Sequence, residues 1–184
     1  MILHLVRHGP THARGMVGWT DLPADLSDRH ALARLSSHLP DVPVVSSDLS
    51  RAVATADAIA GARPRLPHDP ALREMHFGDW EMLHHSQIDP ALSRRFWDNP
   101  GDVSPPNGES WNELTTRVNA AVDRLAVNHE QAIVVVHFGV ILTLLQRALG
   151  ATARQVFAHK IDNLSVTELH LRGEPAARLI NHNP

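Results

Sequence analysis

The sequence predicts an α/β protein, a three-layer α/β/α sandwich with helices on both faces of a mainly parallel central sheet. Short apolar runs that end in glycine, proline or serine alternate with longer segments of helical periodicity. This alternation is typical of strands joined by crossover helices. Polar residues follow several of the apolar runs, and ligands of such sheets lie beyond the carboxyl ends of the strands. The 184 residues are enough for one domain with a sizeable core, so we expect a single domain over residues 1–184.

Residues that start or stop regular structure delimit each expected element. Serine and aspartate cap helices, glycine ends them, and proline interrupts both helices and strands. Ser110 and Glu113 form the Ser-x-x-Glu pattern of a capping box. The expected elements are a strand from Met1 to the turn Gly9-Pro10, a helix from Ser27 to about His38, a strand over 42–47, a helix from Asp48 or Ser50 to about Ala60, a helix over 86–97, a helix from Ser110 to about Asn128, a strand over 132–136, a helix over 140–149, and strands over 163–171 and 176–181.

Composition narrows the class of protein. A hydrophobic fraction of 43% and a formal charge of −3 are those of a soluble globular protein and do not indicate a nucleic-acid partner. No apolar run is long enough to span a bilayer, and the first residues enter a strand rather than a signal peptide. The chain has no cysteine, which agrees with a reducing compartment. We therefore expect a cytoplasmic protein without a membrane partner, whose oligomeric state the sequence leaves open.

Three basic side chains at expected strand or helix ends are suited to a phosphate. Arg7 ends the first strand, Arg51 lies in the first turn of a helix, and His137 follows the most apolar strand. A phosphomonoester dianion needs nearly two positive charges, which the two arginines provide, and His137 adds a donor or a third cation. One cation about 4 Å from the dianion contributes roughly 4 kcal/mol at an effective dielectric constant of about 20, before desolvation costs. Free N–H groups at the start of the Arg51 helix also favour an anion.

Two further residues can provide the reacting groups. His8, as a neutral imidazole, can attack phosphorus and form a phosphohistidine. Glu74 can protonate the departing oxygen and later accept a proton from the attacking water. This role requires a raised pKa for Glu74, which repulsion from a bound dianion favours. Glu81 and Glu109 are nearby carboxylates that could share the acid role or act as ion-pair or capping residues.

The segments Arg7-His8-Gly9, Ser46 to Ala52, Leu72 to Glu81 and Val134 to Gly139, in this order, resemble the histidine phosphatase (phosphoglycerate mutase-like) superfamily. The resemblance covers most of the chain and implies the phosphoglycerate mutase-like fold. It implies His8 as the phosphorylated nucleophile, Glu74 as the proton donor, and Arg7, Arg51 and His137 as the phosphate pocket. The loop Pro105 to Ser110 further resembles that of small bacterial members, including α-ribazole phosphatases.

The chain departs from the family pattern at two positions of the expected site, and its first helix lacks the family's usual glycine and glutamine pair. Arg14 stands where the family often has an asparagine that contacts phosphate, and Phe138 stands where it usually has glycine. We include Arg14 and Thr11 among the substrate-binding candidates, with Gly139 as an amide donor. Arg94 and Arg95 are, with Arg14, candidates for contact with a second anionic group of the substrate.

These observations predict a metal-independent phosphatase that hydrolyses a small-molecule phosphate monoester, releases inorganic phosphate and uses no cofactor. The fourteen histidines show no His-x-x-x-His spacing paired with a carboxylate, so no metal is expected. Three alternatives remain: a phosphoglycerate mutase, a phosphoprotein phosphatase and a non-catalytic phosphate-binding scaffold. The mutase is less favoured because phosphoglycerate mutases tend to have longer insertions and a C-terminal tail over the site. The scaffold is less favoured because all five expected groups are present.

Overall fold

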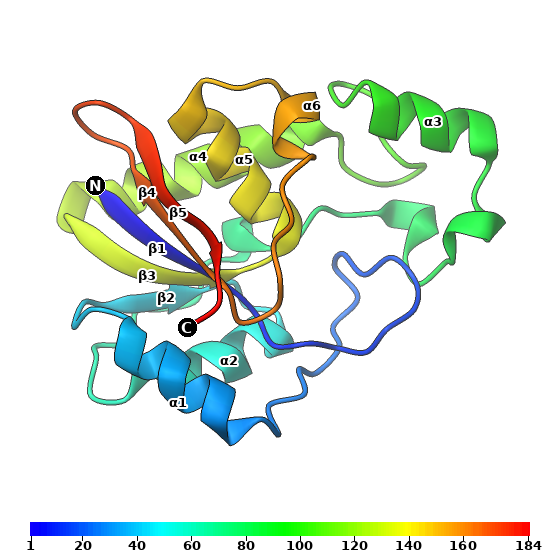
Figure 1. The fold of residues 1–184 in the computed structure, drawn as a ribbon. Coiled ribbons are helices and arrows are strands. Elements are labelled where there is room, and N and C mark those ends of the chain that lie inside the picture. Colours follow the sequence, from blue (N-terminus) through cyan, green and yellow to red (C-terminus); the bar gives the residue numbers. More distant parts are fainter.

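A five-stranded sheet with the order β2-β3-β1-β4-β5 forms the centre of the molecule (Figure 1). The computed structural model describes all of residues 1–184. The strands are β1 (Ile2–Arg7), β2 (Val44–Ser46), β3 (Gln131–Val136), β4 (Val166–His170) and β5 (Ala176–His182). The helices are α1 (Arg29–His38), α2 (Ser50–Ala60), α3 (Pro90–Asp98), α4 (Trp111–Asn128), α5 (Phe138–Leu149) and α6 (Ala153–Val156), and short 3₁₀ turns cover Pro70–Leu72, Gly78–Trp80 and His85–Gln87.

The predicted three-layer α/β/α arrangement is confirmed. Leu3 and Leu5 of β1 belong to a large apolar cluster with α4 and α5, whereas Val6 belongs to a second cluster with α1 and α2. Successive side chains of a strand point to opposite faces, so one strand contributes to both clusters. Figure 1 shows α1 and α2 on one side of the sheet, α4 and α5 on the other, and α3 away from the sheet.

The sheet is mixed rather than mainly parallel in its pairings. β1 and β2 each pair in parallel with β3, while β4 pairs antiparallel with both β1 and β5. β4 is therefore the one strand that runs against the other four. The short β4–β5 connection accounts for the antiparallel pairing of these two strands, because a hairpin can join antiparallel neighbours but a parallel pair needs a long crossover.

Helix starts deviate locally from the sequence prediction. Asp28, rather than Ser27, caps α1, and the residue before α2 is Leu49, which provides no side-chain cap. The helix expected over 86–97 is divided into a 3₁₀ turn and α3, because Pro90 opens a new helix that Asp89 caps. The capping box of Ser110 and Glu113 is present at the start of α4 as expected.

None of the helices combines the length and the apolarity that crossing a membrane requires.

Candidate active site

The carboxyl ends of β1 and β3 bring the two predicted site histidines together. Arg7 and Val136 are register partners in the parallel pair, so the residues that follow them, His8 and His137, are neighbours. Their ring centroids are 5.0 Å apart. The site therefore follows directly from the parallel pairing of two strands that lie far apart in the sequence.

His8 is held as a neutral imidazole with a defined orientation. Its side chain is buried, and Nδ1 lies 2.7 Å from the carbonyl oxygen of Gly9. A carbonyl can only accept, so Nδ1 carries the hydrogen and the lone pair is on Nε2, which has no protein partner. Burial lowers the pKa of His8 to about 3, and the nearby cations Arg51 and Arg7 act in the same direction. At neutral pH, Nε2 is thus available as a nucleophile.

His137 is fully buried next to His8. The hydroxyl oxygen of Ser47, the residue that follows β2, lies 2.6 Å from Nε2 of His137. The other ring nitrogen, Nδ1, is buried without a hydrogen-bond partner. Burial, followed by the proximity of His8 and Arg51, holds the pKa of His137 well below its usual value, so the ring is neutral at pH 7. His137 is therefore a hydrogen-bonding group rather than a third cation.

The two predicted arginines are anchored by main-chain carbonyls. Arg51 is 1% exposed and donates to the carbonyl oxygens of Gly18 and Thr20 at 2.6 and 2.9 Å. Arg7 donates through Nη1 to the carbonyl of Ile161 at 2.6 Å, but its Nε is buried without a partner. Neither arginine pairs with a carboxylate at ion-pair distance, so both retain charge for an anionic ligand.

Glu74 is buried, and its carboxylate is oriented by two backbone amides. The N–H of Gly139 donates to both carboxylate oxygens at 3.1 Å, and the N–H of Met75 donates to Oε1 at 2.9 Å. Burial raises the pKa of Glu74, against these amides and the charges of Arg51 and Arg7. A raised pKa favours the protonated carboxyl, which is the form that a general acid needs.

Of the other residues predicted to contact the substrate, Gly139 binds Glu74, and the rest are partly or fully exposed. The amide of Gly139 binds Glu74, and a side chain at this position would meet the Glu74 carboxylate, so glycine allows this close approach. Thr11 is partly exposed, and Arg14 is exposed without a hydrogen bond or ion pair. Arg94 and Arg95 are exposed on α3.

Phe138 has a defined place despite its departure from the family pattern. It is the first residue of α5, and the Arg7 guanidinium carbon lies 5.5 Å from its ring centroid. This cation–π geometry helps to fix the Arg7 side chain.

The two carboxylates considered as alternative acids are both fully engaged. Glu81 accepts hydrogen bonds from the amides of Gly18, Trp19 and Thr20 and from the Thr20 hydroxyl. Glu109 forms an ion pair with Arg117 at 2.7 Å. These contacts assign both carboxylates to holding loops in place.

Sequence reasoning missed several polar residues that contact the site, among them Asn163 and Arg117. Asn163 donates to the carbonyl of His8 at 2.7 Å, and Arg117 donates to the carbonyl of Glu74 at 3.1 Å. Both bind backbone oxygens, so no complementary side chain in the sequence indicated these contacts.

An apolar cavity adjoins the Glu74 carboxyl. It is about 30 Å³ in volume and is lined by Glu74, Met75, Phe77, Trp97, Trp111, Phe138, Gly139 and Phe157. The five aromatic side chains come from five separate parts of the chain and are partly exposed, except for Trp111. The cavity therefore presents an aromatic wall on the side of the site where Glu74 stands.

The chain belongs to the histidine phosphatase superfamily, branch 1, whose family model matches residues 3–182. It is 34% identical over 200 residues to a bifunctional protein of Mycobacterium tuberculosis, a match that covers 97% of this chain. The chain spans about half the length of the mycobacterial relatives that it matches (53%).

Relatives of similar length are also found. The adenosylcobalamin/alpha-ribazole phosphatase of Salmonella typhimurium is 32% identical over 174 residues, covering 88% of this chain and 86% of that protein. Among solved structures, YhfR of Bacillus stearothermophilus superposes with a TM-score of 0.88 at 28% sequence identity. The superposition covers 98% of this chain and 96% of the YhfR chain. These matches confirm the predicted family and α/β fold.

Proposed function

We propose that this protein hydrolyses phosphate monoesters of small molecules through a phosphohistidine formed on His8, without a metal. The observation that carries the proposal is the fixed neutral tautomer of His8 between two arginines that have no carboxylate partner. A neutral ring nitrogen beside positive charge is the arrangement needed for attack on a phosphate dianion.

The proposed reaction has two steps. In the first, Nε2 of His8 forms a bond to phosphorus while the bond to the leaving oxygen breaks, and Glu74 gives its proton to that oxygen. Arg7 and Arg51 neutralise the charge on the phosphoryl oxygens. In the second, the Glu74 carboxylate takes a proton from water as the water oxygen attacks phosphorus. The P–N bond breaks, inorganic phosphate leaves and His8 is again neutral.

The aromatic wall beside Glu74 supports a leaving group with an apolar part. In this mechanism the leaving oxygen must lie near the Glu74 carboxyl, and the partly exposed rings of Phe77, Trp97, Phe138 and Phe157 lie around the cavity that adjoins it. Burying apolar ligand surface against these rings contributes about 25 cal/mol per Å². Phosphoglycerates lack such a surface, which favours hydrolysis of an apolar ester over mutase activity.

The test is hydrolysis of an aryl phosphate by the purified protein in the presence of a chelator. We expect turnover that the chelator leaves unchanged and that His8→Ala abolishes. The matched control His30→Ala removes an exposed histidine of α1 and should retain activity. Turnover that survives the loss of His8 would exclude this nucleophile. Phosphate binding without turnover on any ester would favour the scaffold, and interconversion of 2- and 3-phosphoglycerate would favour the mutase.

A further inference from the structure

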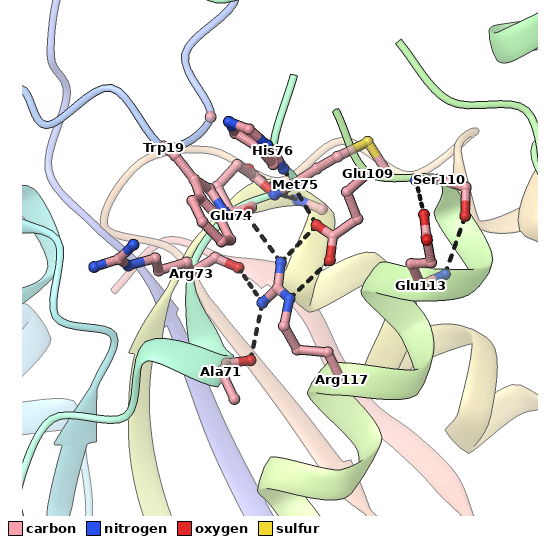
Figure 2. A network of polar contacts seen from close by, with 12 residues as sticks. Trp19, Ala71, Arg73, Glu74, Met75, His76, Glu109, Ser110, Glu113 and Arg117 are labelled. Carbon is pink, nitrogen blue, oxygen red and sulfur yellow. Dashed lines mark hydrogen bonds and ion pairs between the residues drawn. The ribbon is translucent and has the colours of Figure 1, made fainter. Parts of the chain in front are cut away.

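Arg117 uses its guanidinium group to link the segment that carries Glu74 to Glu109 (Figure 2). Nη1 donates to the carbonyls of Ala71 and Arg73, each at 2.9 Å, and Nη2 donates to the carbonyl of Glu74 at 3.1 Å. Nε and Nη2 also bind the two carboxylate oxygens of Glu109 at 2.8 and 2.7 Å. Three backbone carbonyls of residues 71–74 and the carboxylate of Glu109 therefore converge on one side chain of α4.

The Glu74 segment depends on such contacts because it has no regular secondary structure. Glu74 lies between two 3₁₀ turns, where no helix or sheet ladder fixes its backbone. Its carbonyl accepts from both Arg117 and the indole N–H of Trp19, the latter at 2.8 Å. With the main chain held on this side, the carboxyl reaches the amide of Gly139 on the other.

Glu109 neutralises the charge of the largely buried Arg117 guanidinium group. The two side chains are 13% and 19% exposed, and their pairing is bidentate. Glu109 also accepts from the amide of His76, which ties the pair to the segment that follows Glu74. A bidentate pair of opposite charges holds backbone groups firmly while adding little net field at the Glu74 carboxyl.

We propose that Arg117 and Glu109 form a neutral clamp that positions the Glu74 carboxyl for proton transfer to the leaving oxygen. The proposal rests on the hydrolytic function above. Arg117 does not touch the substrate in this mechanism, so it is a positioning residue. Lysine cannot replace it, because a single ammonium group cannot reproduce the planar fork that holds carbonyls and carboxylate together.

Leaving-group dependence separates acid positioning from a merely structural role. The value of kcat/KM for this mechanism reports phosphorylation of His8, the step in which Glu74 protonates the leaving oxygen. An alkyl phosphate needs this proton, whereas p-nitrophenyl phosphate releases a stable anion without it. We expect Arg117→Lys to lower kcat/KM about 10²-fold for the alkyl ester and only about threefold for the nitrophenyl ester, as loss of general-acid catalysis implies.

Matched variants make the result decisive. Arg124→Met removes an exposed ion pair seven residues further along α4 and should leave both rates unchanged. Far-UV circular dichroism and inorganic phosphate binding should show that Arg117→Lys keeps its fold and its phosphate pocket. Glu109→Gln leaves the cation unneutralised beside Glu74, which Arg7 and Arg51 already face, and should move the alkaline limb of kcat/KM to lower pH.

Two results would overturn the clamp. Equal losses for both esters in Arg117→Lys would show a general structural effect, and unchanged rates would show that the contacts do not matter. If Glu74→Gln discriminates between the two esters but Arg117→Lys does not, only the clamp fails. If Glu74→Gln does not discriminate, the acid assignment fails, and the clamp fails with it.

Discussion

Two buried polar regions meet at Glu74, and they differ in how completely their hydrogen-bonding groups are satisfied. On one side, Arg117 uses all of its donor nitrogens on protein oxygens, and Glu81 accepts from several amides of the loop at 18–20. On the other side, Nε of Arg7 and Nδ1 of His137 are buried without partners. The only other such side-chain atom in the chain is the hydroxyl of Thr115.

This difference supports the proposal that one region is structural and the other reactive. An unpaired buried donor costs free energy that a folded protein normally avoids. Arg7 and His137, which carry these two atoms, lie near His8 together with Arg51, and neither arginine pairs with a carboxylate. This supports the proposed binding of a ligand that brings several acceptor oxygens. The satisfied region instead holds the loops that place Glu74 and Arg51.

Replacing the acid should change chemistry far more than stability. Glu74→Gln keeps the shape of the side chain and removes the proton that it transfers. We expect turnover of an alkyl phosphate to fall about 10³-fold, within the range typical of general acid–base catalysis. The free energy of unfolding should stay the same or rise, because an ionisable group leaves a buried site. Urea unfolding alongside steady-state kinetics measures both, and a strong loss of stability would place Glu74 in the structural region.

Replacing a residue of the structural region, whose hydrogen-bonding groups are all paired, should have the opposite effect. The free energy of unfolding should fall first. Glu81→Gln leaves one acceptor oxygen where a carboxylate received amides of Gly18, Trp19 and Thr20. We expect a loss of about 2 kcal/mol in the free energy of unfolding. Activity should also fall, because carbonyls of this loop anchor Arg51. Glu130→Gln, at an exposed position, is the control. Equal free energies of unfolding for the two variants would contradict the structural role of Glu81.

The buried histidine of the reactive region should make the protein sensitive to acid. The unfolded chain binds a proton at His8 near pH 6.5, but the folded chain does not until about pH 3. Because its folded pKa is depressed, His8 penalises the folded state as the pH falls through this window, by about 1.4 kcal/mol per pH unit. His137 and His4 have lowered pKa values and act in the same direction.

Glu74 acts with the opposite sign. Its raised folded pKa means that the folded chain retains a proton above pH 4.5 which the unfolded chain has lost. Its contribution to stability is therefore present at low pH and disappears as the pH rises through the folded pKa. Urea unfolding of wild type and His8→Asn between pH 4 and 6 isolates the His8 contribution. Parallel pH dependences of the two proteins would contradict the depressed pKa.

The smallest effect is expected outside both regions. Arg14 is exposed without a partner, so Arg14→Ala should leave the hydrolysis of a simple aryl phosphate nearly unchanged. For a substrate with a second anionic group, KM should rise about threefold, the scale of an exposed ion pair. Arg29→Ala, on α1, serves as the control. Equal changes in KM for both substrates would remove Arg14 from substrate recognition.

The sequence predicted the arrangement of the proposed reactive region better than that of the structural region, for a physical reason. His8 and His137 follow apolar strands, and parallel strands bring their carboxyl ends to one edge, so their proximity could be anticipated. Arg117 could not be found in this way. Apart from Glu109, eight residues away, its partners are main-chain carbonyls 43 to 46 residues away, and every residue has such a carbonyl whatever its side chain.

Strand direction was also beyond the reach of the sequence pattern. The alternation of apolar and polar residues gives the position of β4 but not its orientation in the sheet. Only the short connection to β5 hinted at an antiparallel pair. The donor role expected for Gly139 likewise depended on tertiary contact, because its amide is occupied by Glu74.

The most direct measurement is a rapid-quench experiment on Glu74→Gln with p-nitrophenyl phosphate. This ester can phosphorylate His8 without an acid, but release of the phosphoryl group from histidine needs Glu74 as a base. We predict a burst of nitrophenolate and a stable phosphoryl group that mass spectrometry locates on His8. A phosphoryl group on another residue, or a burst of equal size in Glu74→Gln/His8→Ala, would contradict the phosphohistidine mechanism.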